Sequence, residues 1–298
     1  MKTTKNIYQQ VTDAIVKQLE SGIIPWQKPW QNELGMGCIS HANGKPYSMI
    51  NQMLLGGRCG EWLTYAQVQA EGGRIKRGEK SSMVVFWQRK NIVKTTPVYN
   101  EEGEQIGETE EIVGTMPILK EYHVFHIDQC EGIKAKYDQG KIEREHETIE
   151  SADEVAMNYA KREELTLLIK QSSKAYYSPS SDMVVVPEQK QYKCIEEYYS
   201  TLYHELVHST GHANRLNRDG IVDMHFFGDE TYSREELVAE MGAAFMLNIL
   251  GIETEKAMRN SAAYIQSWLR ALKNDNKMII AAASKAEKAV KYIMNGEK

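Results

Sequence analysis

The chain has 298 residues, of which 42% are hydrophobic and 26% are charged. This composition is typical of a folded protein with one large domain or two ordinary ones, and it excludes a wholly disordered chain. The net charge of −5 gives no indication of a nucleic-acid partner. No apolar run predicts a membrane helix or a secretory signal, and the four cysteines form no CxxC pair. We therefore expect free thiols and a cytoplasmic protein.

The first 130 residues alternate between helical and extended patterns. Apolar residues at helical spacing predict a helix over 5–22, and the two prolines of IPWQKPW (24–30) exclude a regular helix after it. The pattern further predicts a short helix over 62–73 and strands over 81–88, 92–99 and 111–127. We expect the Gly- and Glu-rich sequence NEEGEQIGETEE to form the turn between the last two strands.

Residues 131–150 are highly charged and have few large apolar side chains, so we interpret them as a linker. Beyond them the sequence predicts long helices over 152–170, 194–210, 233–250, 256–273 and 278–294, with a turn and a strand over 176–187. The predicted protein is α+β with two domains, 1–130 and 151–298, of which the second is mainly helical.

The sequence His-Glu-Leu-Val-His at 204–208 lies in one of the predicted helices. His204 and His208 are one turn apart on the same face, where two imidazoles can bind one zinc ion. Glu205 can reach a water bound to that metal and accept its proton. The pattern predicts a zinc-dependent peptidase, whereas two ordinary surface histidines would be the simplest alternative.

A catalytic zinc needs a third protein ligand. A third histidine after a glycine turn would fall at position 214, which is Asn214, so that arrangement fails. In the later segment SREELVAEMGAAFM, Glu236 and Glu240 are again one turn apart. This segment resembles the acidic helix of gluzincins, so we assign Glu236 as the third ligand and Glu240 as the group that orients a ligand histidine. The reverse assignment remains open, and Glu235 is expected to point elsewhere.

Weaker candidates surround this motif. His212 is equally compatible with orienting a ligand or contacting substrate and with capping the helix. Four further side chains could donate to a developing oxyanion, although a structural role is the simpler interpretation for each: Tyr176, Tyr177, His225 and Tyr232.

Several segments resemble the ArdC-type antirestriction proteins of plasmids and other mobile elements. Those in the first half are IYQQVTDAIVKQLESGIIPWQKPW, KPYSMINQMLL, WLTYAQVQAEGGRIKRGEKSSMVVFW and YHVFHIDQ. Those in the second half are AYYSPSSDMVVVPE, YYSTLYHELVHSTGHANRLNR and YSREELVAEMGAAF. The resemblance covers nearly the whole chain, and it is much more specific than the His-Glu motif alone.

The resemblance implies an N-terminal domain that binds single-stranded DNA and a C-terminal zincin-like metallopeptidase domain. It also implies protection of incoming DNA from host restriction during conjugation, with an unknown protein substrate and no membrane partner. Basic and aromatic residues together suit single-stranded DNA. The candidate contacts are Arg74, Lys76, Arg77, Lys80, Trp26 and Trp30, and the alternative is that the tryptophans are core and the basic run is a charged turn.

Two other functions compete with the peptidase. In one, zinc only stabilises the C-terminal domain, and the protein protects DNA by coating it. Glu205 argues against this alternative, since a structural zinc site needs no general base. The other is a nuclease, for which the sequence offers no suitable carboxylate cluster. The His-His-Glu ligand set would accept Mn²⁺ or Co²⁺ in place of Zn²⁺.

Overall fold

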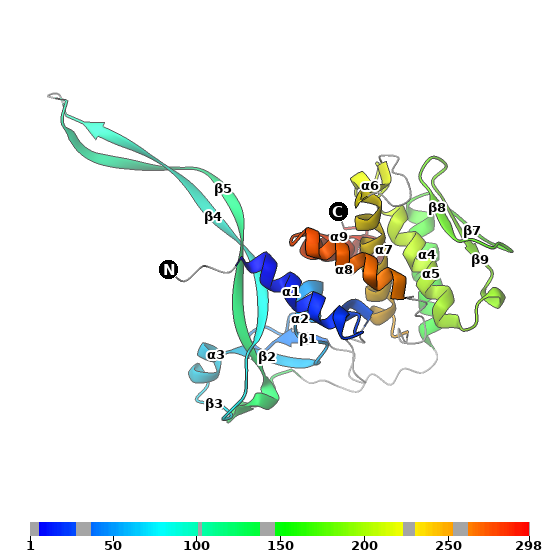
Figure 1. Cartoon of the computed structure of the whole chain (residues 1–298), viewed down its shortest axis with the longest axis horizontal. Helices are drawn as coiled ribbons and strands as arrows, with labels where there is room; N and C mark the ends of the chain where they lie inside the picture. Colours follow the sequence, from blue (N-terminus) through cyan, green and yellow to red (C-terminus); the bar gives the residue numbers. More distant parts are fainter. Residues whose placement is uncertain are drawn as a thin grey trace.

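The computed structural model describes residues 6–27, 37–100, 103–137, 147–222, 230–252 and 262–297. Figure 1 shows the helices of the C-terminal half gathered on one side of the molecule. The first helix of the chain lies next to them, and a long two-stranded hairpin projects from the opposite side (Figure 1). Helices and sheets are both well represented, as the expected α+β class requires.

The N-terminal part is built on a four-stranded sheet in the order β1-β2-β5-β4. Its strands are β1 (Cys38–Ser40), β2 (Gly60–Thr64), β4 (Ser82–Tyr99) and β5 (Gln105–His126). Strands β1 and β2 are parallel, and the other neighbouring pairs are antiparallel. A separate pair is formed by β3 (Arg74–Ile75) and β6 (Cys130–Glu131). The helices of this part are α1 (Ile7–Glu20), α2 (Met49–Leu54) and α3 (Tyr65–Ala70), with 3-10 turns at η1 (Pro25–Gln27) and η2 (Ile127–Gln129).

The helix predicted over 62–73 is wrong at its start, because the residues up to Thr64 belong to strand β2. Thr64 then caps α3. Its hydroxyl accepts from Gln67 N at 3.3 Å, and its own N–H donates to the Gln67 side chain at 2.7 Å. This reciprocal capping box begins the helix at Tyr65. Trp62 and Leu63 are both buried, so the strand that carries them is covered on both faces.

Strands β4 and β5 pair along nearly their whole length and form the hairpin, which we call the arm. The predicted turn between them is too long. Strand β4 ends at Tyr99 and β5 already begins at Gln105, and Asn100 N donates to Glu104 O at 2.9 Å next to the two strand ends. The glutamates that follow belong to β5, which pairs with β4 so that Glu111 lies opposite Lys94 and Glu110 lies opposite Thr95. Both faces of the arm contact solvent here, so charged side chains are tolerated in the strand.

The C-terminal part packs helices on a three-stranded sheet in the order β7-β9-β8. Strand β7 (Thr166–Lys170) is parallel to β9 (Met183–Pro187), and β8 (Tyr176–Ser178) is antiparallel to it. The helices are α4 (Glu147–Arg162), α5 (Ile195–Ser209), α6 (Asp219–Val222), α7 (Glu230–Ile249), α8 (Ala262–Asn274) and α9 (Met278–Asn295), with a 3-10 turn at η3 (Gln189–Gln191).

The helix predicted over 152–170 is wrong beyond residue 162. Helix α4 ends at Arg162, and Glu164 takes a left-handed backbone conformation with φ of 55°. Thr166 N then donates to Asp182 O at 3.1 Å, which starts the pairing of β7 with β9. The apolar run Leu165 to Ile169 is equally compatible with a strand or a buried helix, and sheet pairing decides in favour of the strand.

One hydrophobic core spans both halves of the chain. Val11 and Ile15 of α1 and Met53 of α2 belong to the same buried cluster as the apolar faces of α5, α7 and α9. The contact extends to hydrogen bonding, since Thr12 Oγ1 donates to Asn276 O at 2.9 Å. A division of the chain at 130 and 151 therefore does not divide its core, and those boundaries stay a proposal.

Part of the predicted linker, residues 138–146, lies outside the described part of the chain, as do residues 256–261 of a predicted helix. All four cysteines are free thiols. Within the described ranges, no helix combines the length and the apolar character that crossing a membrane requires.

Candidate metal centre

Helix α5 carries the two histidines of the His-Glu motif. One face of this helix is apolar and fully buried, with Tyr199, Leu202 and Leu206 among its members, and this burial fixes how the helix lies in the core. His204 and His208 lie together on another side of the helix, with their Nε2 atoms 3.1 Å apart. The expected pairing of the two imidazoles is present.

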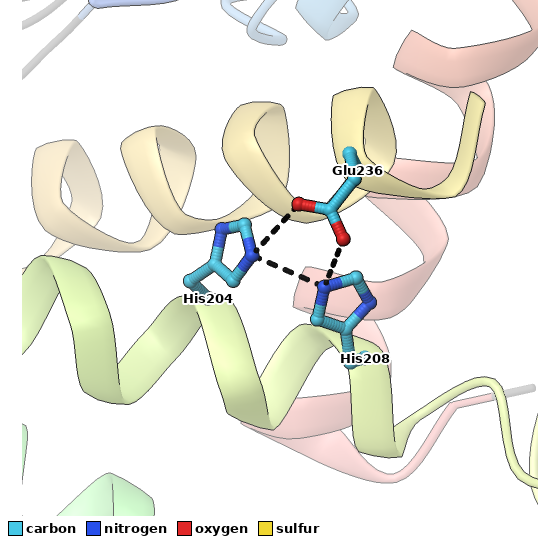
Figure 2. A group of neighbouring side chains, drawn as sticks. All are labelled: His204, His208 and Glu236. Atoms are coloured by element: carbon cyan, nitrogen blue, oxygen red, sulfur yellow. Dashed lines mark hydrogen bonds and ion pairs between the residues drawn. The ribbon is translucent and has the colours of Figure 1, made fainter. Parts of the chain in front are cut away.

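Helix α7 crosses α5 closely and supplies the third side chain. Close approach requires Gly242, because a Cβ there would lie 2.7 Å from Cγ2 of Val207. Glu236 then points at both histidines: its carboxylate oxygens lie 3.5 Å from His204 Nε2 and 3.4 Å from His208 Nε2. Figure 2 shows the three side chains converging from the two helices.

The spacing of these donor atoms suits a single cation. Zinc binds imidazole nitrogen and carboxylate oxygen at about 2.0–2.2 Å, so the ligands of a tetrahedral ion lie about 3.4 Å from each other. The distances among His204, His208 and Glu236 are 3.1, 3.4 and 3.5 Å. Two imidazoles and one carboxylate are also a suitable ligand set for zinc, manganese or cobalt.

Each histidine has a second carboxylate near its other ring nitrogen. Glu240 Oε1 lies 3.7 Å from His204 Nδ1, which is where the sequence analysis expected an orienting group. Glu235 Oε1 lies 3.3 Å from His208 Nδ1. The expectation that Glu235 points elsewhere is therefore wrong: it is 5% exposed and turned into the site.

Arg218 holds Glu235 in this position. Its Nη2 lies 2.6 Å from Glu235 Oε1, and its Nε donates to Oε2 at 2.9 Å. The same guanidinium donates to Thr210 Oγ1 and to Val207 O, both at 2.7 Å, at the C-terminal end of α5. Arg218 thus links the histidine helix to the glutamate helix. A local sequence pattern could not reveal this link, because Arg218 reaches α7 only after the chain has turned back on itself.

Electrostatics within the cluster favour a protonated His208 beside an ionised Glu236. Burial acts to lower the pKa of His208, but hydrogen bonds to Glu235 and Glu236 outweigh it and raise this pKa to about 10. Burial acts in the opposite sense on Glu236, whose pKa is nevertheless well below its usual range because of the two histidines. Burial raises the pKa of Glu240. A cation at the centre would take the place of the histidine protons.

Glu205 follows His204 on α5 and is 8% exposed. Burial and the charge of His208 act to lower the pKa of His204. Glu236, Glu240 and, with the smallest effect, Glu205 act to raise it, and the net change is a raised pKa. The Glu205 carboxylate is thus electrically coupled to the cluster without belonging to the three donor residues.

The weaker candidates have other surroundings. His212 Nδ1 accepts from Asn214 N at 3.3 Å, in the turn after α5. Tyr177 donates its hydroxyl to Asp182 at 2.9 Å, whereas Tyr176 is 41% exposed on strand β8. His225 and the side chain of Tyr232 lie outside the described residues.

The candidate DNA contacts are partly corrected. Trp26 is fully buried, and its ring packs edge-on against Trp268 at 5.1 Å, so it offers no face to a base. Trp30 lies outside the described residues. The four basic side chains are all exposed, but Arg74 pairs with Glu131, and Lys76 donates to Asp128 O at 2.7 Å. The structure brings none of the four together with the metal centre.

Two family models match the chain. Residues 5–125 match the N-terminal domain of anti-restriction factor ArdC, and residues 154–285 match a zincin-like metallopeptidase. The fold and the cluster of donor residues thus define the class of the C-terminal part as zincin-like metallopeptidase. The expected α+β architecture with these two domains is confirmed.

Relatives match over nearly the whole chain. The crystal structures of the antirestriction ArdC protein from plasmid R388 are 33% identical in the metal-free form and 32% identical in the Mn(II)-bound form. Their TM-scores are 0.68 and 0.70, and 97% of this chain is covered in both, with 96% and 97% of the solved chains. The uncharacterized protein y4eC of Sinorhizobium fredii (strain NBRC 101917 / NGR234) is 30% identical over 98% of this chain and 92% of its own length.

Two Escherichia coli proteins named DNA primase TraC are 32% and 33% identical, over 99% and 97% of this chain. The chain spans only 20% and 27% of their length. From these matches we conclude that the chain belongs to the ArdC family of antirestriction proteins. The expected divalent cation agrees with the zincin-like domain and with a relative solved in a Mn(II)-bound form.

Proposed function

We propose that this chain is an antirestriction protein that combines a zinc-dependent peptidase site with binding of single-stranded DNA. The observation that carries the peptidase is the convergence of His204, His208 and Glu236 at the mutual distances of zinc ligands, beside the buried Glu205. Mn²⁺ or Co²⁺ would suit the same donors. We further propose that the domains are 1–130 and 151–298, joined by the segment 131–150.

His204, His208 and Glu236 would hold the cation. Glu240 and Glu235 would fix the orientation of the two imidazole rings through contacts with Nδ1 of His204 and of His208, respectively. The bound cation would supply Lewis acidity toward a water molecule and a peptide carbonyl. Glu205 would accept the proton of the attacking water and later deliver it to the leaving amine. Burial of Glu205 would keep this proton transfer out of bulk solvent.

A peptide substrate would need an extended binding surface near the cation. Strand β8 ends the described sheet β7-β9-β8 and contacts helix α5. Its outer edge can accept an extended chain as an additional strand, with backbone hydrogen bonds that do not depend on side-chain identity. This supports a protein or peptide substrate.

The antirestriction role follows from membership of the family, and protection of incoming DNA during conjugation in the cytoplasm is the role we propose. Binding of single-stranded DNA would belong mainly to the N-terminal part. Arg74, Lys76, Arg77 and Lys80 remain candidate phosphate contacts there, since all four are exposed. The competing proposal is a DNA-binding protein whose metal site is structural.

The variant Glu205→Gln separates the two proposals. Metal content, cleavage of denatured proteins, binding of single-stranded DNA and DNA transfer into a restricting host are measured for wild type and variant. A variant that keeps metal and DNA but loses both cleavage and protection supports the peptidase. Full protection by the variant would instead favour the structural metal site.

A further inference from the structure

A groove runs between the root of the arm and helix α9. It has a volume of about 280 Å³ and is lined by α2, the edge strand β4 and α9. Strand β4 is fixed there because Asn51 of α2 pairs with the backbone of Val85 in both directions, each hydrogen bond being 2.8 Å long. The groove therefore has a rigid wall contributed by the N-terminal part and another contributed by the C-terminal part.

The β4 wall of the groove presents the ring of Trp87 to solvent, 52% exposed although it sits where the sheet joins the body of the protein. Consecutive strand residues point to opposite faces of a sheet, and Phe86 lies on the other face of β4, where its ring packs 5.9 Å from Tyr47 and 5.7 Å from Tyr122. An exposed ring of this size is costly in water unless a partner covers it. The Trp87 ring lies 6.3 Å from Tyr8.

The α9 wall is basic. Lys288 and Lys291 both line the groove and are exposed. Glu287 precedes Lys288 and also lines the groove, but it is already engaged, because it pairs with Lys291 at 2.9 Å and accepts from Met49 N at 3.2 Å. Lys288 makes no ion pair within the described ranges of the chain. A ligand in this groove would meet an aromatic face on one side and positive charge on the other.

We infer that this groove binds single-stranded DNA, with a base stacking on Trp87 and phosphates meeting Lys288 and Lys291. Stacking on aromatic rings combined with a basic wall is how proteins hold single strands without reading their sequence. The inference rests on the proposed DNA binding and changes its location. The site would lie on both halves of the chain, away from Arg74 to Lys80.

Fluorescence anisotropy of a labelled oligodeoxythymidine, over a range of salt concentrations, tests this site in the full chain. Trp87→Ala should weaken binding on the order of tenfold, because a base can no longer stack on the ring. Lys288→Ala/Lys291→Ala should lower the salt slope by about 1.4, because each phosphate that a lysine neutralises on a single strand contributes roughly 0.7. Thermal melting confirms that each variant is folded.

Two matched controls come from exposed positions outside the groove. Lys285 is exposed on α9 but does not line the groove, and Tyr65 is an exposed ring on α3. Lys285→Ala and Tyr65→Ala should bind like wild type. Tryptophan emission adds a direct readout in a Trp30→Phe background: Trp26, Trp62 and Trp268 are buried, so quenching by DNA should largely disappear when Trp87→Phe is added, while binding persists.

The outcomes separate the two proposals. If wild type binds no single-stranded DNA, or binds only the corresponding RNA, both the proposed DNA binding and this site are wrong. If wild type binds DNA and the groove variants bind it equally well with an unchanged salt slope, DNA binding stands and the groove is overturned. Selective weakening in the groove variants supports the site.

Discussion

Glu235 Oε1 lies 3.3 Å from His208 Nδ1, and the same carboxylate is held by Arg218. Both charged side chains are about 5% exposed or less, so neither is compensated by water. Two roles therefore coincide in one residue: Glu235 orients a proposed metal ligand, and it neutralises a buried cation.

Glu235→Ala should reduce both metal affinity and stability. Removal of an orienting partner typically weakens metal binding by about 10- to 100-fold, and removal of one partner of a buried ion pair costs about 3–5 kcal/mol. Metal titration and urea unfolding measure the two effects. Glu20→Gln, which removes one partner of an exposed ion pair with Lys273, should change stability very little. Unaltered metal affinity in Glu235→Ala would refute the orienting role.

Glu236 and Glu240 of α7 should behave differently from each other. Glu236→Gln should lose stoichiometric metal, because its oxygens lie nearest to both Nε2 atoms. Glu240→Gln should keep the metal with reduced affinity, since it contacts only His204 Nδ1. Metal analysis of the purified variants by mass spectrometry decides the matter. The opposite pattern would show that the ligand and the orienting residue are exchanged.

Metal affinity should rise with pH. The pKa of His208 in the metal-free cluster is raised to about 10, so at neutral pH a cation must displace a proton. One displaced proton predicts about a tenfold gain in apparent affinity for each pH unit between about 7 and 9. Competition titrations with a chelator of known affinity provide the measurement. Affinity independent of pH would mean that His208 is already neutral before the metal binds.

The stability of the metal-free protein should follow the opposite trend. A histidine whose folded pKa is raised stabilises the fold below its unfolded pKa of about 6.5. That contribution is lost as pH rises toward about 10, the folded value for His208. Urea unfolding of chelator-treated protein at several pH values tests this, and His208→Gln should show a flatter profile. A wild-type profile as flat as that of the variant would argue against the shift.

The contact of Asp182 with Arg215 and Tyr177 should be sensitive to acid. Burial acts to raise the pKa of Asp182, but hydrogen bonds from Arg215 and Tyr177 lower it below its usual range. A carboxylate of this kind stabilises the fold above its unfolded pKa of about 3.9, and the contribution disappears as pH falls through the folded value. Asp182→Asn should therefore lose stability at pH 6 and change less between pH 5 and 3. Parallel acid profiles for the two proteins would contradict this.

The parts of the site that follow from a helical repeat could be predicted from sequence. His204 and His208 on α5, and Glu236 and Glu240 on α7, are spaced by one turn, and both helices form where expected. The role of Glu235 could not be predicted in this way. Its surroundings depend on how α7 crosses α5 and on Arg218, which comes from the turn between them.

The errors in secondary structure have a common physical origin. The run from Leu165 to Ile169 has no clear local preference for a strand, and the glutamates of β5 have a local preference against one. In both segments, pairing with a neighbouring strand decides the conformation. The prediction of Trp26 as a DNA contact is wrong for a similar reason, because a partner far away in the sequence buries its side chain. Nothing in its neighbourhood along the sequence indicates that Trp268 lies against it.

The shared core of α1, α2, α7, α8 and α9 has a consequence for protein engineering. Cutting the chain between the two family domains would leave α1 and α2 without their apolar partners and expose the matching faces of α8 and α9. A chimera that joins the first half of one relative to the second half of another would need compatible side chains across this seam. The two family domains should therefore be inherited and exchanged as a pair, even though each has its own signature in the sequence.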